Sequence, residues 1–158
     1  MARARDVPGF NCEESFSASA ERVVAVRAAE VFAHSEGVLD MDDIEPLHDM
    51  RVATRRLRAA LEVFAPCFPA KRLRKALKRV KALADALGKR RDRDVAIAFL
   101  VGFAGEAPEA DGAAIEALIE RLRREQRQAN EELAPFLTDK RLKKLRRRLR
   151  KLVKAAAN

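Results

Sequence analysis

Hydrophobic residues recur at helical spacing through most of the chain. In residues 47–64, the clearest example, one face of the expected helix carries Leu47, Met50, Thr54, Leu57, Leu61 and Phe64. Steps of three and four residues place side chains on one face of an α-helix, as a buried stripe requires. No segment keeps the alternation of period two that a half-buried strand shows. The pattern therefore predicts an all-α protein.

Capping and breaking residues divide this pattern into about six helices. The expected helices cover residues 17–35, 43–64, 70–87, 92–103, 111–133 and 139–154. Short connections favour antiparallel packing of sequential helices, so we expect an antiparallel helical bundle. Residues 1–14 are interpreted as a flexible lead-in, and residues 15–157 as a single helical domain.

Local signals set the expected helix ends. Ser17 is a candidate N-cap for the first helix, and Asp42 or Asp43 for the second. Gly88 is expected to end the third helix, and Asp92 and Asp94 suit the start of a fourth. The fourth segment, residues 95–103, is the most apolar in the chain. We expect it to form the buried central helix.

Positive charge is concentrated in three segments. The chain has a formal net charge of +9 and a pI near 10.1. Of its 33 Lys and Arg residues, 25 fall in residues 48–58, 71–93 and 140–154. Like charges gathered in this way repel one another, and an anionic partner would relieve the repulsion. The charge therefore predicts a cationic surface that binds a polyanion.

A second row of side chains lies beside the core stripe of residues 47–64. At helical spacing His48, Arg51, Arg55 and Arg58 are aligned, with no acid on the same line. A face that serves solubility alone usually mixes both signs. The row therefore indicates an anionic ligand. The alternative, that its arginines pair with acids of neighbouring helices, stays open at this stage.

Two motifs resemble the signature of the CHAD family, the conserved histidine α-helical domain. The first is His48-x-x-Arg51-Val52-x-x-Arg55-Arg56-Leu57-Arg58. The second, about thirty residues later, is Leu87-Gly88-x-x-Arg91-Asp92-x-Asp94-Val95. The resemblance implies an all-helical fold whose basic residues bind inorganic polyphosphate. It also implies a structural role for Arg91 and Asp92, as an ion pair that orients the site.

The resemblance and the charge pattern together predict the binding residues. We expect polyphosphate to contact His48, Arg51, Arg55, Arg56, Arg58, Arg74, Lys78, Lys81 and Arg91. His48 can donate to a phosphate when it is protonated, or it can pack against a neighbouring helix. The predicted function is non-catalytic polyphosphate binding in the cytoplasm, in association with polyphosphate granules.

Other functions have weaker support in the sequence. Non-specific nucleic-acid binding is the main alternative, although the cationic segments offer few aromatic residues for base stacking. We find no Gly-rich phosphate loop and no Ser/His/Asp set, so we expect no enzyme. His34 and His48 have no ligand spacing, so neither a metal nor another cofactor is expected. No segment approaches the ~20 apolar residues of a membrane span, and no signal peptide is visible.

The chain departs from the family pattern at Arg93, where the motif usually has an apolar residue, and in its number of halves. CHAD proteins generally contain two similar halves, each with its own basic motif, and no second copy follows residue 100 here. A single half would leave an apolar face uncovered. We therefore predict a two-fold homodimer. The alternatives are that the chain is a fragment, or that its last two helices cover that face.

Overall fold

The computed structural model describes residues 3–9, 11 and 13–156, and this part of the chain is all-α, as predicted. Its long helices are α1 (Phe16–Ala33), α2 (Glu45–Val63), α3 (Ala70–Ala104), α4 (Gly112–Leu133) and α5 (Asp139–Val153). Three short 3-10 helices occupy the turns: η1 (Ala65–Cys67), η2 (Glu109–Asp111) and η3 (Ala134–Leu137). The described part contains no strand. None of these helices combines the length and hydrophobicity that a membrane span requires.

The bundle has five long helices instead of about six because Gly88 does not end a helix. Residues 70–104 form one continuous helix, and Gly88 lies inside it without a positive φ. Glycine in a helix interior costs only about 1 kcal/mol relative to alanine. Good helix-forming residues surround it on both sides. The single glycine therefore cannot interrupt the helix.

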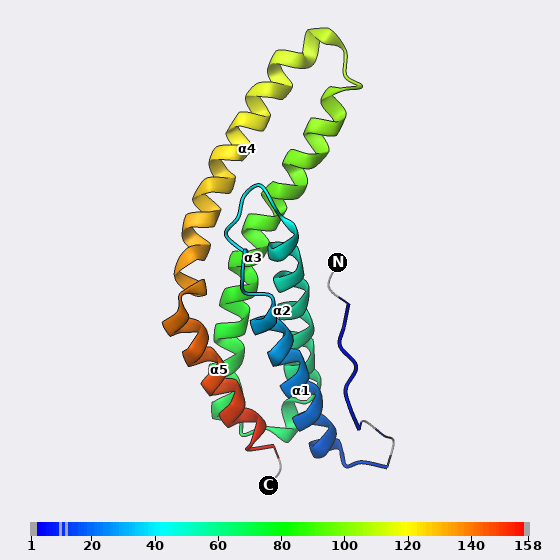
Figure 1. Cartoon of the computed structure of the whole chain (residues 1–158), viewed down its shortest axis with the longest axis vertical. Helices are drawn as coiled ribbons and strands as arrows, with labels where there is room; N and C mark the ends of the chain where they lie inside the picture. The colour runs from blue at the N-terminus through cyan, green and yellow to red at the C-terminus, as the bar shows by residue number, and fades with distance from the viewer. Residues whose placement is uncertain (1–2, 10, 12, 157–158) are drawn as a thin grey trace.

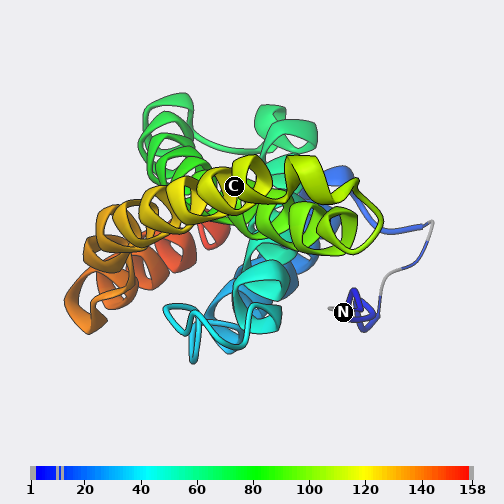
Figure 2. The ribbon, with the colours of Figure 1, turned by 90° about the horizontal axis from the view of Figure 1, so that it is seen from above.

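Helices α1 to α4 alternate in direction along the chain, whereas α5 continues in the direction of α4 instead of packing antiparallel against it as expected (Figure 1). α1 and α2 pack against each other, α2 against the lower half of α3, and α5 against both α1 and α3. Seen from above, the turn between α4 and α5 and the N-terminal segment lie on opposite sides of the bundle (Figure 2). α3 is thus the central element, with α2 on one flank and α5 on another.

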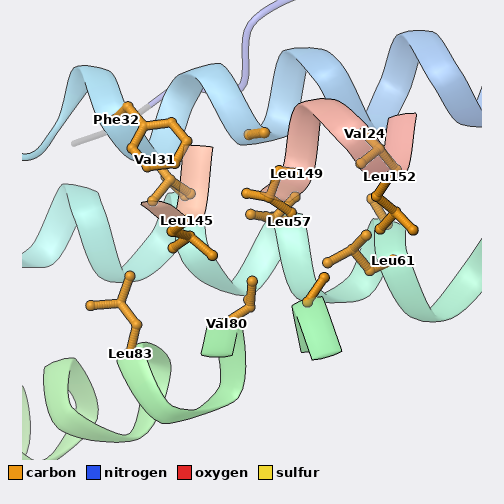
Figure 3. Close-up of a cluster of buried hydrophobic side chains, with 14 of the residues drawn as sticks. Val24, Val31, Phe32, Leu57, Leu61, Val80, Leu83, Leu145, Leu149 and Leu152 are labelled. Atoms are coloured by element: carbon orange, nitrogen blue, oxygen red, sulfur yellow. The ribbon is translucent and has the colours of Figure 1, made fainter. Parts of the chain in front are cut away.

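Four helices share one hydrophobic core. Figure 3 shows side chains from α1, α2, α3 and α5 directed toward one another, among them Val24, Leu57, Val80 and Leu149. Leu57 and Leu61 of α2 are completely buried, as are Leu47 and Met50. The core stripe predicted for residues 47–64 is therefore confirmed, except that Phe64 is only half-buried.

The upper halves of α3 and α4 extend beyond the other helices as a two-helix arm (Figure 1). The apolar segment 95–103, expected to be the buried central helix, lies on this arm. Instead of being buried, Phe99 is 68% exposed and Phe103 46%. The prediction was wrong because a hydrophobic run does not reveal whether neighbouring helices are long enough to cover it.

The helix ends differ in detail from those expected. The hydroxyl of Ser15, not that of Ser17, accepts a hydrogen bond from the Ala18 N–H and caps α1. At α2 the Asp43 carboxylate accepts from the Glu45 N–H, next to Pro46 in the first turn. Thr138 occupies the N-cap position of α5, although its side chain makes no capping bond.

The segment before α1 lies along that helix. The Arg5 N–H donates to the Glu30 carboxylate, and Arg27 donates to the Arg5 carbonyl oxygen at 2.9 Å. Arg22 similarly donates to the Pro8 carbonyl oxygen. The division into a lead-in and one domain stays a prediction.

Candidate functional site

The predicted basic row lies along the edge of α2. Because the core stripe is fixed by burial, the neighbouring positions face the rim of the bundle. His48, Arg51 and Arg58 are half-buried there, and Arg55 is exposed. Among the described residues, no carboxylate forms an ion pair with Arg51 or Arg55. These two guanidinium groups are therefore available to an external anion.

One carboxylate joins α2 to α3 at the lower end of this row. Glu62 accepts from Arg58 at 3.1 Å and forms an ion pair with Lys81 of α3 at 3.3 Å. The hydrogen bond from Arg58, and then that from Lys81, hold the pKa of Glu62 below its ordinary value. This part of the surface is therefore partly neutralised. Arg56 is engaged in an interaction within the chain.

The contact between Glu62 and Lys81 also fixes the register of the two helices. Arg51 precedes Glu62 by eleven residues, and Arg91 follows Lys81 by ten. Both helices rise about 1.5 Å per residue, and they run in opposite directions. Arg91 therefore lies near the level of Arg51 along the bundle. A ring nitrogen of His48 and one guanidinium nitrogen of Arg91 are buried without a hydrogen-bond partner in the described structure. The two sequence motifs therefore lie at similar levels on neighbouring helices, at the upper end of the row.

Three predicted residues of α3 come together on its outer face. Arg74, Lys78 and Lys81 line a shallow hollow of 440 Å³ together with Asp85. Lys81 continues the cationic surface toward Arg58. Lys78 continues it in the other direction, toward α5.

The strongest concentration of positive charge lies between α3 and α5, a region that the predicted residue set reached only at Lys78. Two adjoining hollows, of 650 and 520 Å³, share Lys75 and Arg148. We call them together the α3–α5 trough. Among the described residues no carboxylate lines it, and its cations are Arg72, Lys75, Lys78, Arg79, Arg141, Lys144, Arg147, Arg148, Lys151 and Lys154.

Local packing explains how α5 contributes to this trough. Leu145, Leu149 and Leu152 are buried in the core, which leaves the flanking positions of the helix beside α3. Arg148 donates to the Lys75 carbonyl oxygen at 3.4 Å and so links the two walls. The sequence signals both basic segments, but their apposition depends on the packing of α5 against α3.

A buried ion pair within α3 is hydrogen-bonded to α4. It joins Arg90 to Asp94 at 2.9 Å, and Gln126 of α4 donates to the same carboxylate at 2.7 Å. This corrects the expected caps, because Asp94 is buried in mid-helix and Asp92 is exposed in mid-helix. It also places the ion pair at Arg90 and Asp94 instead of Arg91 and Asp92. Burial lowers the pKa of the Arg90 guanidinium, and Asp94 opposes this effect.

A comparison with protein families matches residues 22–158 to the CHAD domain. The chain belongs to the CHAD family. CHAD domains are associated with polyphosphate metabolism, are linked to polyphosphate granules and are generally non-catalytic. No curated protein and no solved structure matches the chain. In this CHAD domain, the described residues contain no group of three or more potential metal-ligating side chains.

Proposed function

We propose that this protein binds inorganic polyphosphate, without catalysis, on a cationic surface that crosses α3. The observation that carries the proposal is the α3–α5 trough, whose described lining includes ten Lys and Arg residues and no carboxylate. Phosphate oxygens need only hydrogen-bond donors and positive charge. Arginine supplies paired donors, and lysine supplies a mobile charge. The family's association with polyphosphate metabolism supports the same ligand.

The surface offers a continuous path for a long chain of phosphates. Lys78 lines both the trough and the outer hollow of α3. Lys81 then contacts Glu62 beside Arg58 of α2. From Arg58 the row continues upward through Arg55 and Arg51. A short anion such as a nucleotide would neutralise only part of this path, so affinity should increase with chain length.

The proposal is tested by two pairs of substitutions and a control with the same change of charge. Arg51→Glu with Arg55→Glu alters the α2 row, and Arg147→Glu with Lys151→Glu alters the trough. Arg124→Glu with Arg127→Glu alters exposed residues of α4 that line neither surface. We expect both site variants to weaken binding of long-chain polyphosphate at least about tenfold relative to the control.

Equal binding by all three variants and the wild type would contradict the proposal. An equal loss in all three would show that net charge alone attracts the anion, without a defined surface. Helix content from circular dichroism should be the same in each variant, because every substituted residue is at least partly exposed.

Non-specific nucleic-acid binding remains the alternative, since the same charge attracts any polyanion. The one aromatic ring at the trough, Phe136, is already covered by the guanidinium of Arg141 at 5.6 Å from the ring centroid. It does not offer a free stacking surface. We therefore expect single-stranded DNA of equal charge to bind more weakly than polyphosphate.

A further inference from the structure

The two-helix arm, residues 95–120, has a surface unlike the rest of the molecule. Large hydrophobic side chains are exposed on it: Val95, Phe99, Val101, Phe103 and Leu118. The rings of Phe99 and Phe103 stack with their centroids 6.3 Å apart. Exposed apolar patches of this kind mark sites of protein association.

The charge on the arm is also distinctive. Residues 95–120 contain five acidic residues and no Lys or Arg, although the whole chain carries a net charge of +9. A partner that covers the arm should therefore be both apolar and cationic. Two arms that met face to face would bring like charges together, which is unfavourable.

A surface of that description exists on the same protein. A groove of 430 Å³ between α1 and α5 has an apolar floor that includes Ala29, Phe32 and Val153. Arg146, Arg150 and Lys154 lie around it, and Glu21 is the one acid among its described lining residues. The guanidinium of Arg146 already covers the Phe32 ring at 4.7 Å from its centroid.

The two surfaces agree in length as well as in character. The stripe from Val95 to Phe103 advances eight residues along α3, about 12 Å. The α5 wall from Arg146 to Lys154 also advances eight residues. The arm lies at the opposite end of the molecule from the part of the bundle that contains α1 and α5 (Figure 1). Two antiparallel copies could therefore each place an arm on the partner's groove.

We propose that this protein forms a two-fold dimer in which the apolar, acidic arm of each copy docks in the α1–α5 groove of the other. The interface is isologous, because the same contact between arm and groove occurs twice about the two-fold axis and closes the assembly. It would cover the hydrophobic patch and pair acidic with basic side chains. The inference does not depend on polyphosphate, because the two docking surfaces lie outside the α2 row and share only Lys154 with the α3–α5 trough.

Sedimentation velocity at micromolar concentration, without any polyanion, tests the proposal. The wild type should sediment as a dimer of the 17.7 kDa chain. Phe99→Asp with Phe103→Asp should weaken the dimer at least about tenfold, and so should Ala29→Glu in the groove. Val63→Asp and Ala59→Glu alter exposed residues outside both surfaces and should leave the dimer intact.

Salt dependence distinguishes this arrangement from a pairing of two arms. Docking of an acidic arm on a basic groove should weaken as salt is raised, whereas two acidic arms should associate more tightly when their repulsion is screened. A monomeric wild type would overturn the proposal. So would a dimer that tolerates Ala29→Glu or becomes tighter in high salt.

Discussion

Single charged residues in this protein have different roles according to their burial. Arg90 is fully buried and pairs with Asp94, whereas Arg51 and Arg55 stand at the rim without a carboxylate partner in the described structure. A buried charge requires compensation because removal from water is costly. An exposed charge stays in contact with water and does not require a partner of opposite charge. Arg90 is therefore expected to act on stability, and the rim arginines on ligand binding.

The first prediction concerns Arg90. Arg90→Leu leaves the Asp94 carboxylate buried without its positive partner, so we expect a loss of about 3–5 kcal/mol in the free energy of unfolding. Arg93→Leu removes a half-exposed ion pair with Glu125 and should cost about 1 kcal/mol or less. Urea denaturation measures both values. Similar losses in the two variants would contradict the role given to the buried pair.

The second prediction concerns Glu62 and pH. Its pKa in the folded protein lies below the ordinary value of 4.5 because Arg58 and Lys81 donate to the carboxylate. Its stabilising contribution is therefore complete above the unfolded pKa and is lost as pH falls through the folded pKa. Glu62→Gln should lose less stability than the wild type as pH falls below 4.5. Parallel acid-denaturation curves for the two proteins would argue against this coupling.

At the scale of helices, α3 shows what the sequence determines and what it does not. Its core positions Leu73, Val80 and Leu87 recur every seven residues and are buried, so they can be recognised from spacing. The continuity of α3 through Gly88 cannot be recognised from the sequence, since a glycine ends a helix only where the backbone turns away. Likewise, the sequence reveals the basic character of α5 but not its apposition to α3, which depends on tertiary packing.

The third prediction follows from this continuity. A Cβ added at Gly88 would meet no atom within 4 Å, and the residue lies inside a regular helix. Gly88→Ala should therefore stabilise the protein by about 0.4–1 kcal/mol, chiefly by restricting the unfolded chain. Thermal unfolding would measure this as a higher Tm. A lower Tm would show that α3 needs a flexible break near the middle.

At the scale of the whole molecule, charge and hydrophobicity are separated along the long axis. The lower bundle carries the α2 row and the α3–α5 trough, and the arm carries acids and exposed apolar side chains. The α2 part of the cationic surface was predictable from one helix. The trough and the arm were not predictable from single helices, because each depends on where neighbouring helices lie.

The fourth prediction concerns salt and the extended cationic surface. Binding of a polyanion releases counterions, so affinity should fall as salt is raised, with a slope set by the number of charges neutralised. Replacing Arg147 and Lys151 by Glu should reduce that slope as well as the affinity. Titrations at several salt concentrations would measure it. A slope unchanged in this variant would place the polyanion elsewhere.

The central claim is that the surface across α3 recognises polyphosphate and not merely negative charge. Competition between long-chain polyphosphate and single-stranded DNA of equal total charge, at about 0.15 M salt, tests it most directly. Each competitor is measured by its concentration of negative charges. We expect polyphosphate to displace bound DNA at a lower such concentration than the concentration at which DNA displaces bound polyphosphate. Displacement of polyphosphate by an equal or smaller concentration of DNA charge would contradict the account.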